Sequence, residues 1–181
     1  LIGQWFAARH PSRVDTLFIG NSLVDPAKLD LTGRSPAAMR RAPSSLHRRI
    51  VVGSLDSWPE PGPAYRRLKV ILRHNGTRLL SARAIKARVL AVVTGKAVPP
   101  LTLPQDRIVI IESADDPLIP RAVQKAMRGK YPRAKLYRLR RGGHYPYVTR
   151  PAVYTAILAR HLPRARSRAA RHPAGRVRRI A

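Results

Sequence analysis

The residues best suited to chemistry lie in two loops, each following an apolar run typical of a strand. Asp115 and Asp116 come shortly after residues 107–111, and His144 follows two glycines after residues 134–139. The carboxyl ends of neighbouring parallel strands meet at one edge of a sheet, where sites form. There a carboxylate can orient an imidazole, which in turn takes a proton from a nucleophile. We therefore expect an acid–histidine pair within hydrogen-bonding reach, about 3 Å.

A nucleophile for such a pair is not evident in the sequence. The chain has no cysteine. Ser54 follows a glycine, but it lacks the second glycine of the G-x-S-x-G turn that exposes a nucleophilic serine between a strand and a helix. The residues before Ser54 also make a poor strand, so we reject Ser54 as the nucleophile.

The remaining histidines and the large aromatic residues are expected to have no chemical role. The histidines show no spacing typical of metal ligands, so we expect them to be solvated, and we expect neither a metal nor a cofactor. Trp5, Trp58 and the tyrosines are expected to pack in the core or in the helical insertion described below. The histidines concerned are His10, His47, His74, His161 and His172.

Strands and helices alternate along both ends of the sequence. The apolar, β-branched runs predict buried parallel strands, and the segments between them have helical periodicity. Strand–helix–strand order with short links predicts an α/β fold, a parallel sheet with helices on its faces. The expected strands are residues 14–20, 107–111 and 134–139, and the expected helices are residues 1–9, 119–129 and 147–162.

The middle of the chain has a different character. Helical patches over residues 37–50, 64–74 and 77–87 are interrupted by prolines and glycines, which predicts an inserted helical cap. Residues 89–94 are ambiguous between a strand and an extended lead-in. We divide the chain into core residues 1–26, cap residues 27–86, core residues 87–162 and a basic tail, residues 163–181, expected to be disordered.

Several stretches together resemble the α/β-hydrolase superfamily. GQWFAARHPSRVDTLFIGNS resembles the segment after the nucleophile turn, and ADDPLIP and GGHYPY resemble the acid and histidine loops. NSLVDP, RIVVGS and YPRAKLYRLRRGGHYPYVTRP are similar to stretches of the maspardin family, in the same order and spacing. The resemblance covers roughly residues 1–162.

The resemblance implies roles for particular residues. Asp116 matches the family's acid, which directly precedes a small turn residue, while Asp115 is left as a helix-start or surface acid. His144 matches the base, although the maspardin family has Asn there. The nucleophilic serine and the oxyanion-hole donors are implied upstream of Leu1.

Three functions are compatible with this resemblance. The first is a fragment of a serine hydrolase acting on ester-like or acyl substrates. The second is a non-catalytic, protein-binding adaptor of the same fold. The third is a basic scaffold subunit of an RNA-rich assembly.

The charge of the chain is strongly positive. There are 36 Lys and Arg against 9 Asp and Glu, which gives a net charge of +27. Such a charge favours a polyanionic partner, RNA or an anionic membrane reached through the Arg-rich tail, or it reflects an arginine-rich composition with no special partner. No apolar run is long enough to cross a bilayer. We expect a cytoplasmic protein, with membrane association as the alternative.

Overall fold

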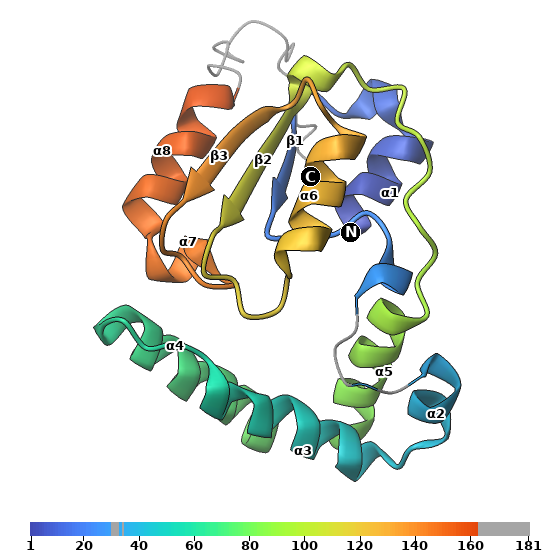
Figure 1. Ribbon diagram of the computed structural model, residues 1–181, viewed down its shortest axis with the longest axis vertical. Helices are drawn as coiled ribbons and strands as arrows, with labels where there is room; N and C mark the ends of the chain where they lie inside the picture. Colours follow the sequence, from blue (N-terminus) through green and yellow to red (C-terminus); the bar gives the residue numbers. More distant parts are fainter. Residues whose placement is uncertain (30–32, 34, 163–181) are drawn as a thin grey trace, which may run out of the picture.

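A parallel three-stranded sheet forms the centre of the molecule (Figure 1). A computed structural model describes residues 1–29, 33 and 35–162. The strands lie in the order β1 (Leu17–Gly20), β2 (Ile108–Ser113) and β3 (Lys135–Leu139). All six residues of β2 are buried, because the strand has neighbours on both edges and helices over both faces. The α/β architecture expected from the sequence is confirmed.

Helices cover both faces of the sheet. α1 (Ile2–Arg9) and α6 (Arg121–Lys130) pack on one face, and α8 (Pro151–His161) packs on the other. Successive residues of a strand point to opposite faces, so each face has its own set of apolar contacts. Ile108 and Ile110 contact the cluster that contains Ala7 of α1 and Met127 of α6. Val109 and Ile111 contact Ile157 of α8.

One charged side chain of β2 is buried in the core. Glu112 has only 3% of its surface exposed. Nη1 of Arg128, on α6, lies 2.6 and 2.8 Å from its two carboxylate oxygens, and Nε of Arg138, on β3, lies 3.4 Å away. The buried charge is therefore compensated from the neighbouring helix and the neighbouring strand.

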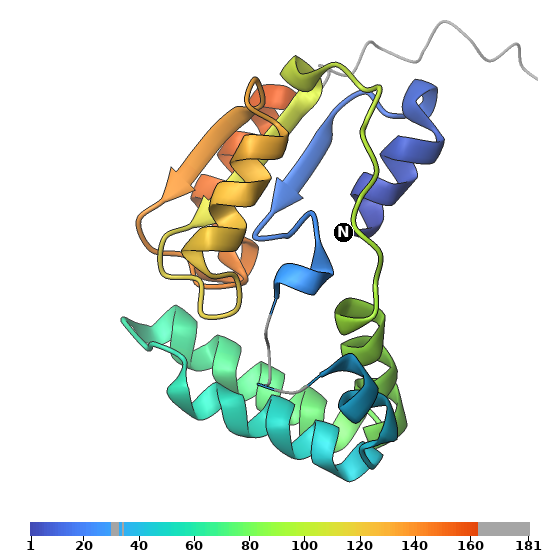
Figure 2. The same ribbon diagram turned by 45° about the vertical axis from the view of Figure 1, so that its right-hand side comes forward.

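A layer of helices lies beyond the carboxyl ends of the strands, as Figures 1 and 2 show. It is built from residues between β1 and β2, where the sequence predicted a helical cap. None of the helices in the described parts of the chain is both long and apolar enough to cross a bilayer. The helices of this layer are α2 (Pro36–Arg41), α3 (Ser44–Ser54), α4 (Pro63–His74) and α5 (Ala82–Val93).

Several helices are shorter than predicted, mostly because of prolines. The patch predicted at 37–50 is two helices, α2 and α3, separated at Pro43. The helix predicted at 147–162 is divided at Pro151 into α7 (Pro146–Thr149) and α8. Proline cannot donate the helical backbone hydrogen bond, and it disfavours helical geometry in the residue before it. The tail, residues 163–181, lies outside the described residues.

The interpretation of residues 89–94 as a strand or an extended lead-in was wrong. α5 continues through Val93, and a π-helical turn, Asn75–Leu79, replaces the first part of the helix predicted at 77–87. Ser81 caps α5 by accepting a hydrogen bond from the Ala84 amide at 3.1 Å. Valine by itself favours strands, and α5 contains Val89, Val92 and Val93. Packing of α5 in the helical layer overrides this weak preference.

Candidate active site

The acid–histidine pair expected from the sequence is present at the carboxyl edge of the sheet. Nδ1 of His144 lies 3.0 Å from Oδ2 and 3.1 Å from Oδ1 of Asp116. The Asp116 side chain is fully buried, whereas 20% of the His144 side chain is exposed. A carboxylate only accepts hydrogen bonds, so Nδ1 carries the proton and Nε2 is left as the proton acceptor. This is the arrangement of the acid and the base in a nucleophilic triad.

Asp116 is held in place by its own loop. Its Oδ1 accepts hydrogen bonds from the backbone amides of Leu118 at 2.8 Å and Ile119 at 3.1 Å. These two residues lead into α6. The loop between β2 and α6 therefore fixes the direction in which the carboxylate meets the imidazole.

Asp115 has a different set of partners from its neighbour. Its Oδ1 accepts from the amides of Gly142 at 2.8 Å and Gly143 at 2.9 Å. Its Oδ2 accepts from the Tyr65 hydroxyl, on α4, at 2.8 Å. Asp115 thus ties the acid loop to the histidine loop and to the helical layer, while Asp116 is the partner of His144.

The two glycines before His144 are required by close packing. A Cβ at Gly142 would lie 2.5 Å from the Ser113 hydroxyl oxygen, so a side chain does not fit there. Gly143 has φ +57°, a left-handed conformation that side chains disfavour, and Tyr65 packs directly against it. The pair of glycines lets the histidine loop approach both β2 and α4.

Asn21 joins three loops at the same edge of the sheet. It directly follows β1 and has φ 34°. Its Oδ1 accepts from the Ser113 amide at 2.7 Å, and its Nδ2 donates to the Ser113 hydroxyl at 3.1 Å and to the Gly143 carbonyl at 2.6 Å. This role was not predicted from the sequence, although an Asn directly after a buried strand is a signal, since Asn tolerates positive φ.

Aromatic side chains enclose the histidine. The rings of His144 and Tyr145 meet edge to face with centroids 4.9 Å apart, and Tyr145 stacks with Trp58 at 6.2 Å. Burial raises the pKa of the Tyr145 hydroxyl, and the neighbouring Tyr147 and Asp116 add to this. Burial also raises the pKa of Tyr65 well above its usual value, with its hydrogen bond to Asp115 contributing further. Both hydroxyls therefore remain neutral around the pair.

A cavity of about 310 Å³ lies between the helical layer and the two loops. Leu118 and Tyr145, the neighbours of the Asp116 loop and of His144, form one part of its wall. The rest comes mainly from aliphatic side chains of the helical layer, and Arg88 is the one Lys, Arg, Asp or Glu among the described lining residues. Such a cavity suits an apolar group of a small ligand. The lining includes Met39, His47, Ile50, Val51, Ser54, Leu55, Trp58, Leu72, Asn75, Leu80, Ile85 and Val89.

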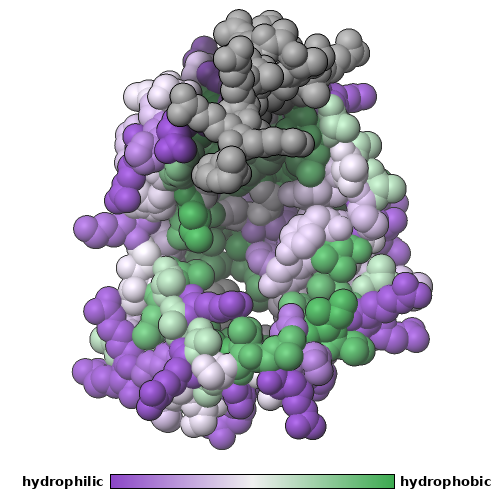
Figure 3. Space-filling view, turned by 180° about the vertical axis from the view of Figure 1, so that it is seen from behind, coloured by the Kyte–Doolittle hydropathy of each residue, from purple (hydrophilic) through white to green (hydrophobic). Residues whose placement is uncertain are grey.

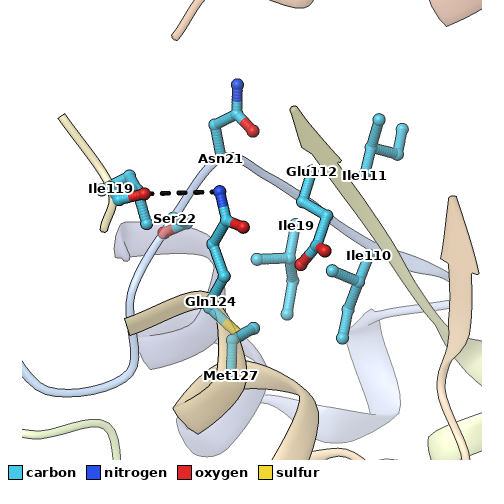
Figure 4. Close-up of a pocket in the computed structure, with 9 residues that line it drawn as sticks. All are labelled: Ile19, Asn21, Ser22, Ile110, Ile111, Glu112, Ile119, Gln124 and Met127. Atoms are coloured by element: carbon cyan, nitrogen blue, oxygen red, sulfur yellow. Dashed lines mark hydrogen bonds between the residues drawn. The ribbon is translucent and has the colours of Figure 1, made fainter. Parts of the chain in front are cut away.

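A second hollow, behind the acid loop, has a structural role. It lies between β1, β2 and α6, and Figure 4 shows its lining residues. Gln124 of α6 donates from Nε2 to the carbonyls of Ser113 at 2.9 Å and Ile119 at 3.3 Å, the latter drawn as the dashed line. The volume of this hollow is about 10 Å³, which leaves room for at most about one water molecule. Gln124 thus anchors both ends of the loop that carries Asp116.

One prediction about the other histidines was wrong. His47 is fully buried, and its Nε2 donates to the Met39 carbonyl at 2.9 Å, because α3 turns this residue towards α2. His10 and His74 are exposed as expected. His161 is half-buried, with Nε2 2.8 Å from the Tyr137 hydroxyl, and His172 lies outside the described residues.

The described residues provide no partner for Nε2 of His144. The Ser54 hydroxyl donates to the Val51 carbonyl at 2.9 Å within α3, and no hydroxyl in residues 1–29, 33 and 35–162 hydrogen-bonds to Nε2. Within the same residues, no group of three or more histidine, cysteine or carboxylate side chains could hold a metal ion.

The comparisons with known proteins identify the fold. No protein-family model and no curated protein matches the sequence. Among solved structures, an enol-lactonase from Burkholderia xenovorans matches with a TM-score of 0.65 and 16% identity, over 88% of this chain and 60% of that one. The fold is that of part of an α/β hydrolase.

Two further structures support this assignment. The 2-hydroxy-6-oxo-6-phenylhexa-2,4-dienoate hydrolase from a Rhodococcus strain matches with a TM-score of 0.58 and 16% identity, over 89% of this chain and 60% of that one. The type II thioesterase of the borrelidin biosynthetic cluster matches with a TM-score of 0.56 and 17% identity, over 90% and 61%. The chain thus spans about 60% of these hydrolases. At such low identity the likeness establishes the fold and not a particular reaction.

Proposed function

We propose that this chain provides the acid, Asp116, and the base, His144, of a serine hydrolase that cleaves ester-like or other acyl substrates. The observation that carries the proposal is the hydrogen bond between Nδ1 of His144 and the buried Asp116 carboxylate. Asp116 holds the imidazole in one tautomer and stabilises its charged form. Nε2 then takes the proton of the attacking hydroxyl and returns it to the leaving group.

The nucleophile is proposed to come from a part of the protein that precedes this chain. Two observations support this. The chain corresponds to about 60% of its structural neighbours, and no described hydroxyl bonds to Nε2 of His144. The oxyanion-hole donors are proposed to come from the same part, because the residue after the nucleophile supplies one of them.

The cavity supports a substrate with an apolar group. Its wall of aliphatic and aromatic residues reaches Tyr145, next to the proposed base. An acyl or alcohol group in the cavity would place its ester bond near His144. Relationship to the maspardin family is a finer proposal that rests on the sequence stretches alone. Where that family has Asn, this chain has His144 paired with Asp116, which favours a hydrolase over an adaptor.

The test is hydrolysis of p-nitrophenyl esters of increasing chain length by the protein that includes the preceding segment. Asp116→Asn should lower kcat by about 10⁴-fold, because the amide stabilises the wrong imidazole tautomer. His144→Ala should reduce turnover to the residual rate that the oxyanion hole and substrate binding provide without a base. Asp106→Asn, at an exposed aspartate away from the pair, is the matched control and should have no effect. Unchanged turnover in Asp116→Asn would refute the proposed roles.

A further inference from the structure

α4 has two unlike sides. Tyr65, Leu68 and Lys69 are buried, with 9% or less of their surface exposed, and Leu72 lines the cavity. On the other side, Arg67, Val70, Ile71 and His74 have the i, i+3, i+4, i+7 spacing that places residues on one face of a helix. Arg78 and Leu79 continue this exposed surface on the π-helical turn. We call these six residues the outer face of α4.

The outer face exposes three large apolar side chains, which is unusual for a helix face in contact with water. Val70 is 64% exposed, Ile71 is 51% exposed and Leu79 is 66% exposed. Figure 3 shows that the part of the molecule formed by the helical layer carries hydrophobic atoms among many hydrophilic ones. An exposed apolar group rimmed by polar residues is typical of an interaction site.

The charges around this apolar group that have no counter-charge are positive. Residues 63–79 contain five Lys and Arg and no Asp or Glu. Arg66 and Lys69 pair with Glu60, and Arg73 pairs with Asp56. Within the described parts of the chain, neither Arg67 nor Arg78 forms an ion pair, so both positive charges of the outer face are uncompensated.

We infer that the outer face of α4 binds the surface of an anionic phospholipid membrane. A helix lying in the membrane interface needs apolar side chains that enter the acyl boundary and basic side chains that contact the headgroups. Val70, Ile71 and Leu79 supply the first, and Arg67 and Arg78 supply the second. RNA would use the charge but not the apolar residues. An acidic protein is the other conceivable partner, and the experiment below distinguishes it.

This membrane contact does not depend on the proposed hydrolytic activity. The contact would place the helical layer against the bilayer. The cavity would then lie just behind α4, because Leu72 and Asn75 line it from the side of the helix opposite the outer face. It also differs from a contact made by the basic tail, because it requires insertion of apolar side chains and not charge alone.

The chain has no cysteine, so a single introduced cysteine can carry a site-specific probe. In the full chain, Val70→Cys on α4 and Val153→Cys on α8 are each labelled with an environment-sensitive dye. Val153 is 47% exposed and serves as the matched control. With phosphatidylglycerol-containing vesicles, the Val70 probe should shift to the blue and be quenched by lipid-borne spin labels, while the Val153 probe should do neither.

Binding itself is measured by vesicle co-sedimentation. Arg67→Glu and Arg78→Glu should each weaken binding by at least about fivefold, and salt should reduce the effect. Ile71→Asp should weaken it by about tenfold while thermal unfolding stays as in the wild type. Vesicles of phosphatidylcholine alone should bind much more weakly.

Two outcomes would overturn the inference. One is the absence of a difference between the Val70 and Val153 probes when the protein is bound to anionic vesicles. If neither probe responds, the tail alone makes the contact, and if both respond equally, insertion is not specific to the outer face of α4. The other is a Val70 probe that responds to RNA or to an acidic protein but not to vesicles.

Discussion

At the scale of single residues, two adjacent aspartates do different work. Asp116 contacts His144 and accepts two amides of its own loop, whereas Asp115 accepts two amides of the histidine loop and the Tyr65 hydroxyl. Both side chains contact the histidine loop, but Asp116 meets the imidazole and also orders its own loop, whereas Asp115 connects the acid loop to the histidine loop backbone and to α4. Asp115 is therefore expected to matter first for stability and Asp116 first for activity.

Asp115→Ala tests this division. The change leaves the amides of Gly142 and Gly143 without their acceptor, and each unsatisfied buried group costs about 1–3 kcal/mol. We expect the free energy of unfolding to fall by about 3 kcal/mol in urea denaturation. Asp116→Asn, measured alongside, should lose much less, because the Asn side-chain oxygen can still accept from the amides of Leu118 and Ile119. Equal stability of Asp115→Ala and the wild type would contradict the role of Asp115 as a tie between loops.

Tyr65 is expected to lower the free energy of unfolding at alkaline pH. Its pKa is raised in the folded protein, whereas in the unfolded chain it ionises near pH 10, at about the ordinary tyrosine value. The folded state therefore keeps a proton that the unfolded state loses, and stability falls as the pH rises above about 10. Burial raises the pKa of Tyr131 to about 12, so this residue acts with the same sign.

Unfolding in urea from about pH 8 to about pH 11 measures this effect. The wild type should lose stability over the upper part of this range, Tyr65→Phe should lose less, and Tyr65→Phe/Tyr131→Phe should lose least. Parallel curves for all three proteins would show that neither tyrosine is responsible.

The sequence predicts Asp116 and His144 but not what holds them. Each of the two follows a strand in a short recognisable loop, so local pattern is sufficient. Tyr65 lies 50 residues from Asp115, and Asn21 lies 122 residues from Gly143. No local pattern connects such partners, since the contact exists only after the strands have paired.

At the scale of elements, the sheet was predictable and the helical layer only in part. β2 is a run of β-branched residues buried on both faces, which gives a strong signal. α5 contains the same residue types but is helical, because its neighbours and the Ser81 cap decide its state. Prolines mark the divisions at Pro43 and Pro151, which the predictions ran through.

The contact between β2 and α6 provides a test at this scale. Arg128→Met removes the main cation beside the buried Glu112 carboxylate, and a charge left uncompensated in a core costs about 3–5 kcal/mol. Because Arg138 remains 3.4 Å away, we expect the lower end, about 3 kcal/mol, by thermal unfolding. Adding Glu112→Gln should restore part of the loss. A double variant less stable than Arg128→Met would contradict this account.

At the scale of the whole molecule, positive charge dominates. Only 9 acidic residues stand against 36 basic ones, and several of the acids are engaged in ion pairs or in the candidate site. Seven of the arginines lie in residues 163–181. We expect these charges to provide most of the binding to a polyanion.

Binding to heparin or RNA at varied salt measures this contribution. The logarithm of the binding constant should fall steeply with the logarithm of the salt concentration, and deletion of residues 163–181 should make the slope shallower. Arg121→Gln, at an exposed arginine of α6 that forms no ion pair within the described residues, keeps the tail and serves as a control for charge lost elsewhere. No retention at about 0.1 M salt would show that the arginines reflect composition and not a polyanionic partner.

The register of the sheet determines when the site can form during synthesis. Leu17 pairs with Ile108 and Val109 pairs with Lys135, and every strand pair is parallel. β1 can therefore pair only after the helical layer and β2 have been synthesised. The hydrogen bond from Asn21 to the Gly143 carbonyl can form only after residue 143 has been synthesised. At about 5–20 residues per second, ribosomes need several seconds for this stretch. Non-local parallel pairing also slows folding itself. Asp116 and His144 can meet as soon as β2 pairs with β3, whereas the Asn21 hydrogen bonds that hold the histidine loop form only when β1 joins the sheet.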